Sequence, residues 1–231
     1  MNNSFLEKAR TGLYDMGKSE LLEDAFNELC SKEVGSVEEL QIWLKEKDEI
    51  FKYIEEVTTK NYINFNSYND NEEYKKRFVY DQEVLNPIIE KYKNRLDKKF
   101  YESKFRDELT SYYNLINRRV KNSIELFREE NINLGIEESK NTTKYFDITG
   151  SMTVMWRGEE KTLPEMNKYL KDSDRGIREE AWKTVFSRRL KDALELDNIM
   201  DELIKIRNKI AKNAGCKDYV EYKFKELLRF D

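Results

Sequence analysis

Apolar residues recur at steps of three and four positions along most of this chain, which is the spacing of one face of an α-helix. The pattern predicts helices over residues 18–31, 72–100, 105–129 and 132–145, and a long helix that a capping box opens at Ser36. The polar stretch 61–71 favours a turn, although its apolar residues could extend that long helix. Pro87 lacks an amide hydrogen, so we expect a kink or a break near 85–87.

The period of the pattern changes from about four to two over the segment Met152–Thr162, which predicts a β-hairpin. Gly158 can take a positive φ, as a tight reversal requires, so that Glu159–Thr162 returns antiparallel to the first strand. The apolar side chains that share one face of the first strand are Met152, Val154 and Trp156.

Two helices are predicted after the hairpin. Thr162 and Glu165 have the spacing of a capping box, which opens a short helix through Leu170. A much longer helix is expected over Asp174–Asn213, because it begins at an acidic N-cap and its apolar residues keep to helical steps. Gly215 is expected to close it, since glycine is the usual left-handed C-cap.

A last amphipathic helix is predicted over Tyr219–Phe230, and it reaches Asp231 without a cap. Chains usually finish in a polar stretch or a capped element, so this pattern favours a truncated chain. The apolar face of the 174–213 helix that would meet the absent part is then exposed. Since large exposed apolar patches are unusual on monomers, we expect weak self-association or limited solubility.

Composition agrees with a mainly α fold, because 38% of residues are charged and the chain has only eight glycines and two prolines. We expect long antiparallel helices in a bundle or in hairpins, with one small β-hairpin at about Met152–Thr162. The simplest division lies near Gly150. Residues 1–149 would form an N-terminal helical lobe, and residues 150–231 the β-hairpin and long-helix unit.

Charge and apolar runs exclude several partners. Forty-two basic and 46 acidic residues give a net charge of −4 with interspersed signs, so no nucleic-acid partner is expected. No apolar run is long enough to span a membrane, and the N-terminus lacks the apolar core of a signal peptide. Cys30 and Cys216 lie far apart, and a disulfide between them is possible but unsupported, so a reducing cytoplasm fits them better.

No residue of this chain is identified as catalytic or metal-ligating, and the substrate-binding residues are unknown. The chain has no histidine, no calcium-loop pattern and no nucleophile motif. The acids at 172–174 are explained as helix caps, and Arg178 can pair with Asp174 one turn earlier.

The aromatic residues allow two interpretations. They could line a peptide channel, but at helical spacing most belong in a core, and we expect Tyr112, Phe127 and Phe186 to be buried. Trp156 and Arg157 could contact an absent lobe, or the hairpin could pack on its own helices. Both alternatives for the hairpin stay open.

Short patterns in a fixed order carry a resemblance that is strongest between residues 134 and 222. They read Ile148-x-Gly150; Thr153-Val154-x-Trp156-x-Gly158-Glu159-Glu160-x-Thr162-Leu163; Asp174-Arg175-x-x-Arg178-x-x-Ala181-Trp182; and Arg207-x-x-Ile210-Ala211-x-x-Ala214-Gly215-x-x-x-Tyr219-x-Glu221-Tyr222. With these, the chain resembles the oligoendopeptidase F branch of the thimet-type zinc metallopeptidases. The resemblance implies an enzyme that hydrolyses short peptides in a deep channel, with zinc held by a His-Glu-x-x-His helix and a further Glu.

This chain departs from the family at the metal site, because that chemistry needs two imidazoles on one helix face and the chain has no histidine. The family carries its zinc helix downstream of the matched region. The resemblance therefore implies a non-catalytic N-terminal part, with 150–231 as the start of the peptidase domain, truncated before the zinc site. Zinc, short peptides and a C-terminal catalytic lobe then belong to the full-length parent, and this chain alone is expected to be inactive. The alternative is a free-standing helical interaction module that keeps the scaffold without activity.

Overall fold

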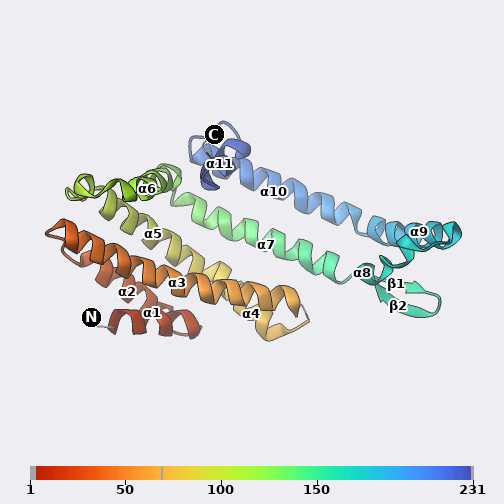
Figure 1. The fold of residues 1–231 in the computed structure, drawn as a ribbon. Coiled ribbons are helices and arrows are strands. Elements are labelled where there is room, and N and C mark those ends of the chain that lie inside the picture. Colours follow the sequence, from red (N-terminus) through yellow and green to blue (C-terminus); the bar gives the residue numbers. More distant parts are fainter. Residues whose placement is uncertain (1–3, 69, 230–231) are drawn as a thin grey trace. The chain divides into compact units, whose positions relative to one another are not determined.

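The computed structural model of the chain describes residues 4–68 and 70–229, and it is mainly helical with a two-stranded antiparallel sheet (Figure 1). The mainly α fold with one β-hairpin is thus confirmed. The helices are α1 (Ser4–Tyr14), α2 (Ser19–Ser31), α3 (Val37–Ser67), α4 (Glu72–Tyr80), α5 (Asn86–Tyr101), α6 (Asn114–Leu126), α7 (Glu130–Gly150), α8 (Leu163–Met166), α9 (Arg175–Lys191), α10 (Ala193–Asn213) and α11 (Tyr219–Glu226). The strands are β1 (Thr153–Trp156) and β2 (Glu159–Thr162), and the shorter turns are the π-helix η1 (Asp81–Leu85) and the 3₁₀ turns η2 (Arg106–Glu108), η3 (Ser111–Tyr113) and η4 (Tyr169–Lys171).

Contacts between residues divide the chain into two compact units. Unit 1 comprises Met1–Ile136 and Asn208–Asp231, and unit 2 comprises Glu137–Arg207. This division does not coincide with the expected border near Gly150. Both borders between the units fall inside long helices, α7 and α10.

The core of unit 1 lies between α1, α2, α3 and α5. Phe26 of α2 is fully buried, and its ring stacks on that of Tyr92 with centroids 5.1 Å apart. Trp43 of α3 is also fully buried, and its indole nitrogen donates to the Leu29 carbonyl oxygen at 2.9 Å. The indole thus satisfies its one polar atom at the C-terminal end of α2, which joins α2 to α3.

The beginning of α3 lies where the sequence predicts it. The Ser36 hydroxyl accepts from the Glu39 amide at 3.2 Å, while the Glu39 carboxylate accepts from the Gly35 amide at 2.7 Å, one residue before the expected partner. The helix then continues to Ser67, through much of the polar stretch 61–71. The apolar residues of that stretch thus extend the helix, the second of the two outcomes that the sequence allowed.

The interruption expected near Pro87 takes the form of a π-helical turn. The segment η1 joins α4 to α5, and Pro87 lies in the first turn of α5. In the first turn of a helix an amide hydrogen has no helical acceptor, so Pro87 removes no hydrogen bond there. The π-turn therefore accommodates the proline while α4 and α5 follow each other almost without interruption.

The helix expected over 105–129 begins later than predicted. Two 3₁₀ turns occupy its first part, and α6 begins at Asn114. Thr110 is extended between these turns, with φ −63° and ψ 164°, so the helical face is lost there. Tyr112 is consequently 81% exposed, which contradicts its expected burial. Phe127 follows the end of α6 and is only half-buried.

The hairpin of unit 2 forms as predicted, with Thr153 opposite Thr162 and Trp156 opposite Glu159. Arg157 and Gly158 both have positive φ, 51° and 86°, as a two-residue hairpin turn requires. Trp156 is 3% exposed, and its ring lies 5.0 Å from that of Tyr169. The hairpin therefore packs on its own unit, which decides between the two alternatives for Trp156.

The long helix expected over 174–213 is two helices, α9 and α10, which meet at Asp192. The Asp192 amide bonds the Arg189 carbonyl oxygen, its carboxylate pairs with Arg188, and its carbonyl oxygen accepts from the Leu196 amide at 3.0 Å. Asp192 thus ends one helix and begins the next. Aspartate is a weak helix former, which makes a break at this position favourable, while the apolar residues keep their helical spacing on both sides of it.

The ends of these helices follow local chemistry. Asp174 caps α9, accepting from the Gly176 amide at 2.6 Å. Arg178 does not pair with Asp174 as expected, because its guanidinium donates to the Asp172 and Ser173 carbonyl oxygens instead. Gly215, with φ 76°, closes α10, and the Cys216 amide bonds back to the Ala211 carbonyl oxygen at 2.9 Å.

The last helix is shorter than predicted. It ends at Glu226 because Leu228 takes a left-handed conformation, φ 57°, and the Arg229 amide then bonds the Phe224 carbonyl oxygen at 2.8 Å. The helix therefore has a C-terminal cap, contrary to the expectation. Phe230 and Asp231 lie outside the described residues.

Candidate functional site

Two surfaces stand out on this chain, an apolar stripe on unit 2 and a groove on unit 1. The α9 stripe consists of Trp182, Phe186 and Leu190, four residues apart on α9, and Leu194 at the start of α10. They are 52%, 42%, 71% and 75% exposed respectively. Phe186 was expected in the core, so that prediction is wrong.

The stripe is exposed because α9 has apolar residues on two faces. Ala181 and Val185 point into the core that contains Met152, Val154 and Trp156 of the hairpin. Trp182 follows Ala181 and Phe186 follows Val185 by one position, so these stripe side chains point to a different side of the helix from the buried ones. The Trp182 and Phe186 rings are tilted by 32° with their centroids 4.6 Å apart, and the Arg189 guanidinium lies 5.9 Å from the Phe186 ring centroid.

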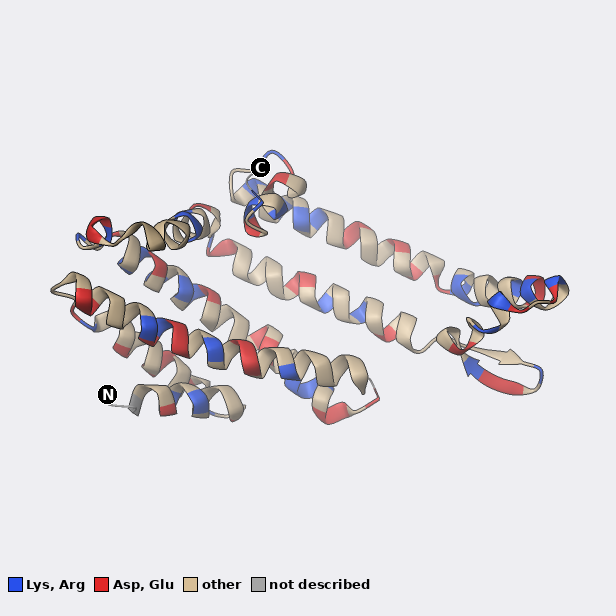
Figure 2. Cartoon of the chain, in the orientation of Figure 1, with Lys and Arg blue, Asp and Glu red and all other residues tan. Residues whose placement is uncertain are grey.

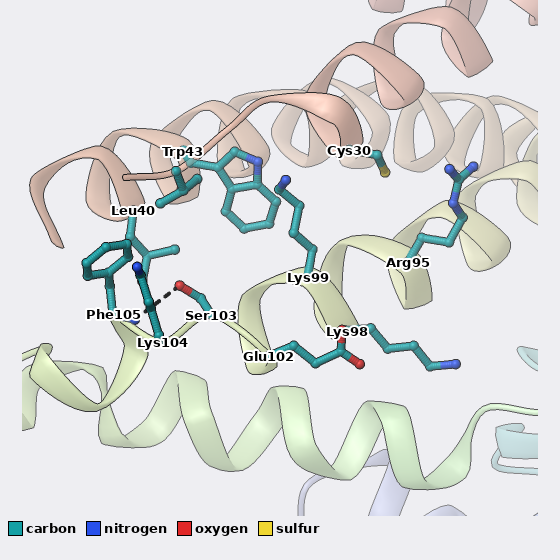
Figure 3. Close-up of a pocket in the computed structure, with 11 residues that line it drawn as sticks. Cys30, Leu40, Trp43, Arg95, Lys98, Lys99, Glu102, Ser103, Lys104 and Phe105 are labelled. Carbon is teal, nitrogen blue, oxygen red and sulfur yellow. Dashed lines mark hydrogen bonds between the residues drawn. The ribbon is translucent and has the colours of Figure 1, made fainter. Parts of the chain in front are cut away.

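The groove lies in unit 1, beside the C-terminal ends of α2 and α5, and has a volume of about 490 Å³. Figure 3 shows Cys30, Leu40 and Trp43 on one side and the α5 residues on the other. Its lining residues are Cys30, Val34, Leu40, Trp43, Arg95, Lys98, Lys99, Glu102, Ser103, Lys104 and Phe105.

Two of the cations in the groove also hold the helices together. The Lys99 ammonium donates to the Lys32 carbonyl oxygen at 2.7 Å, at the C-terminal end of α2. The Arg95 guanidinium donates to the Asn27 side-chain oxygen at 3.1 Å and lies over the Tyr92 ring. Burial raises the pKa of the Cys30 thiol, so it stays protonated and is a poor nucleophile at neutral pH.

The residues of this chain do not fit the zinc site that the resemblance implies. The sequence has no histidine, and among residues 4–68 and 70–229 no group of three Cys, Asp or Glu side chains could hold a metal ion. Cys30 and Cys216 are both free thiols. The acidic cluster at 172–174 serves as a helix cap, as expected.

The remaining surface is mixed in charge, and Figure 2 shows Lys and Arg interspersed with Asp and Glu along the long helices. None of the described helices combines the length and the apolar character that a bilayer crossing requires.

The chain is similar to known peptidases in sequence and in fold. Residues 14–127 match the family of peptidase M3 N-terminal domains. The crystal structure of a protein assigned as an oligoendopeptidase F from Bacillus anthracis is 25% identical, with a TM-score of 0.88, over 94% of this chain and 40% of that one. The chain thus spans about two-fifths of the length of this relative. No curated protein matches the sequence.

Two further solved structures share the fold. PZ peptidase A with an inhibitor is 24% identical, with a TM-score of 0.84, over 94% of this chain and 39% of that one. The oligoendopeptidase F from Enterococcus faecium is 14% identical, with a TM-score of 0.65, over 97% of this chain and 47% of that one. The chain belongs with the M3 peptidases and corresponds to the N-terminal part of an oligoendopeptidase F-like member.

Proposed function

We propose that this chain is the non-catalytic N-terminal part of a cytoplasmic zinc metallopeptidase that hydrolyses short peptides in a deep channel. Its helices would form one wall of that channel and restrict access by size. One observation carries the proposal: almost the whole chain resembles two-fifths of an oligoendopeptidase F, and no histidine lies within it. The zinc and the hydrolytic chemistry would then belong to the other part of the enzyme.

The α9 stripe supports this proposal as the surface that meets the rest of the enzyme. Four large apolar side chains at helical spacing are unusual on a free surface, since an exposed apolar patch commonly marks an interface. The Bacillus anthracis relative is longer than this chain, so its polypeptide has a further part against which such a surface would pack. We therefore assign the stripe to contact with the C-terminal catalytic lobe.

The proposal is tested by measuring zinc content and peptide hydrolysis on the purified chain, before and after incubation with zinc. We expect no stoichiometric zinc and no cleavage of a fluorogenic pentapeptide. Stoichiometric zinc together with cleavage that survives rigorous purification would place the chemistry in this chain and overturn the proposal.

The coding sequence beyond the codon for Asp231 supplies a second test. A continuing frame with His-Glu-x-x-His and a downstream Glu supports the peptidase assignment. A stop codon there would reject it and favour the free-standing interaction module, whose partners would then be sought by binding.

A further inference from the structure

The groove of unit 1 differs in charge from the rest of the molecule. Four cationic side chains line it, from Arg95, Lys98, Lys99 and Lys104, against the single carboxylate of Glu102, which leaves a local charge of +3 (four minus one). The chain as a whole carries −4. Positive charge is therefore concentrated at a concave site on an acidic protein.

The helix dipole explains only part of this concentration. Lys98 and Lys99 lie in the last turn of α5, where cations complement the partial negative charge of a helix C-terminus. Arg95 lies a turn earlier and Lys104 lies beyond the helix end, so neither position gains from that effect. These two extend the positive charge along the groove.

Two of the four cations face the inner side of the groove. In Figure 3 Arg95 and Lys99 point toward the α2–α3 side, while Lys98 and Glu102 point away from it. Arg95 donates one hydrogen bond to Asn27, and Lys99 donates one to the Lys32 carbonyl oxygen. A guanidinium has five N–H donors and an ammonium three, so donors remain for a ligand.

The groove also has an apolar wall. Val34 and Phe105 are half-buried at its surface, with Leu40 and Trp43 fully buried behind them. The Lys104 ammonium lies 4.9 Å from the Phe105 ring centroid, so charge and apolar surface adjoin. A simple inorganic ion would leave this wall uncovered, whereas an anion with an apolar body would contact both.

We infer that this groove binds a small organic anion, a carboxylate or a phosphate ester carrying an apolar group. The anionic group would lie at Lys99, which Figure 3 places between Arg95 and Lys104, and the apolar group would lie against Val34 and Phe105. A volume of about 490 Å³ suits a ligand of this size. Short peptides carry such a carboxylate at their C-terminus, and phosphorylated metabolites carry such a phosphate ester.

The test uses three probes on the full chain: N-acetylphenylalanine, its uncharged amide, and phenyl phosphate. Binding is followed by NMR of the three tryptophan indole N–H signals, of which only Trp43 lines the groove. We expect both anions to shift the Trp43 signal and leave those of Trp156 and Trp182 unmoved. The amide should not bind, and added salt should weaken the binding of the anions.

A charge-removing variant gives the second arm. Lys99→Gln with Lys104→Gln keeps polar side chains but removes two charges, and we expect about tenfold weaker anion binding or more. Lys45→Gln with Lys91→Gln removes the same charge from exposed positions of α3 and α5 outside the groove and should bind as the wild type. Thermal unfolding verifies that both variants are folded.

The outcomes separate the possibilities. Tighter binding of N-acetylphenylalanine identifies a carboxylate ligand, and tighter binding of phenyl phosphate identifies a phosphate ester. Absence of any Trp43 shift in the wild type, equal binding of the amide, or equal loss in the two double variants would each overturn the inference. None of these results depends on whether the chain is part of a peptidase.

Discussion

Helices α2 and α9 carry apolar residues at the same helical spacing, but the structure covers them differently. Four apolar residues of α2, Leu22, Ala25, Phe26 and Leu29, are at most 2% exposed because α1, α3 and α5 surround them. In α9, Ala181 and Val185 are buried, while Trp182, Phe186 and Leu190 are exposed. The apolar period therefore identifies the faces of a helix, but not which of them finds a partner within the chain.

The largest expected difference in stability is between Phe26→Ala in α2 and Phe186→Ala in α9. Phe26→Ala should lower the free energy of unfolding by about 3–5 kcal/mol, because it leaves a cavity in a packed core. Phe186→Ala should cost only about 0.5–1 kcal/mol, since it removes a largely exposed ring whose main aromatic contact is with Trp182. Urea denaturation followed by circular dichroism measures both. Equal losses would mean that the α9 stripe is covered within the chain.

The second prediction concerns self-association through the α9 stripe. We expect the sedimentation coefficient of the wild type to rise with concentration, and that of a Trp182→Glu, Leu190→Glu variant to stay constant. Charges on the stripe would have to be desolvated in any contact between copies. Leu115→Glu on α6, at a position that is 56% exposed, is the control and should behave as the wild type. A wild type that stays monomeric at high concentration would contradict the expectation.

The features that the sequence predicts well have their causes within a few residues. The caps at Ser36, Thr162 and Asp174 and the left-handed Gly158 and Gly215 all lie where expected, because each depends on a hydrogen bond or a dihedral angle of its own turn. These short-range rules fix where elements begin and end.

The features that the sequence missed depend on distant packing. The break at Asp192 divides the predicted helix without a proline or glycine at the point of change. The groove joins residues from Cys30 to Phe105, which come together only when α2 packs beside α5. Its sole sequence signal was the basic cluster at the end of α5, which also has a local explanation in the helix dipole.

Burial can also destabilise, and Asp81 in unit 1 gives the third prediction. Its carboxylate is 1% exposed, Asn61 donates to one oxygen at 2.7 Å, and no hydrogen bond from the described residues reaches the other, which lies 3.5 Å from the Arg77 Nε. Desolvation raises the pKa of Asp81, and the bond from Asn61 and the charge of Arg77 offset this only in part.

A raised folded-state pKa means that the folded protein holds the Asp81 proton more tightly than the unfolded chain. The associated stability is present below the unfolded pKa and is lost as pH rises through the folded one. Asp81→Asn removes this loss. The free energy of unfolding of the variant, relative to that of the wild type, should therefore increase as pH rises from about 3 to about 7. If the free energy of unfolding of the variant instead decreased relative to that of the wild type as pH rose, Arg77 would be shown to stabilise the charged form of Asp81.

The smallest predicted effects come from two glycines that share open surroundings but differ in backbone conformation. No atom lies within 4 Å of a methyl group built at Gly135 or at Gly158, so packing contributes to neither substitution. Gly135 lies within α7, where Gly→Ala should stabilise by about 0.5–1 kcal/mol because the unfolded chain loses freedom. Gly158 has φ 86°, so the same change should destabilise by about 1 kcal/mol or more. Thermal unfolding of the two variants should thus move in opposite directions, and a shared sign would show that the hairpin turn relaxes to accept a side chain.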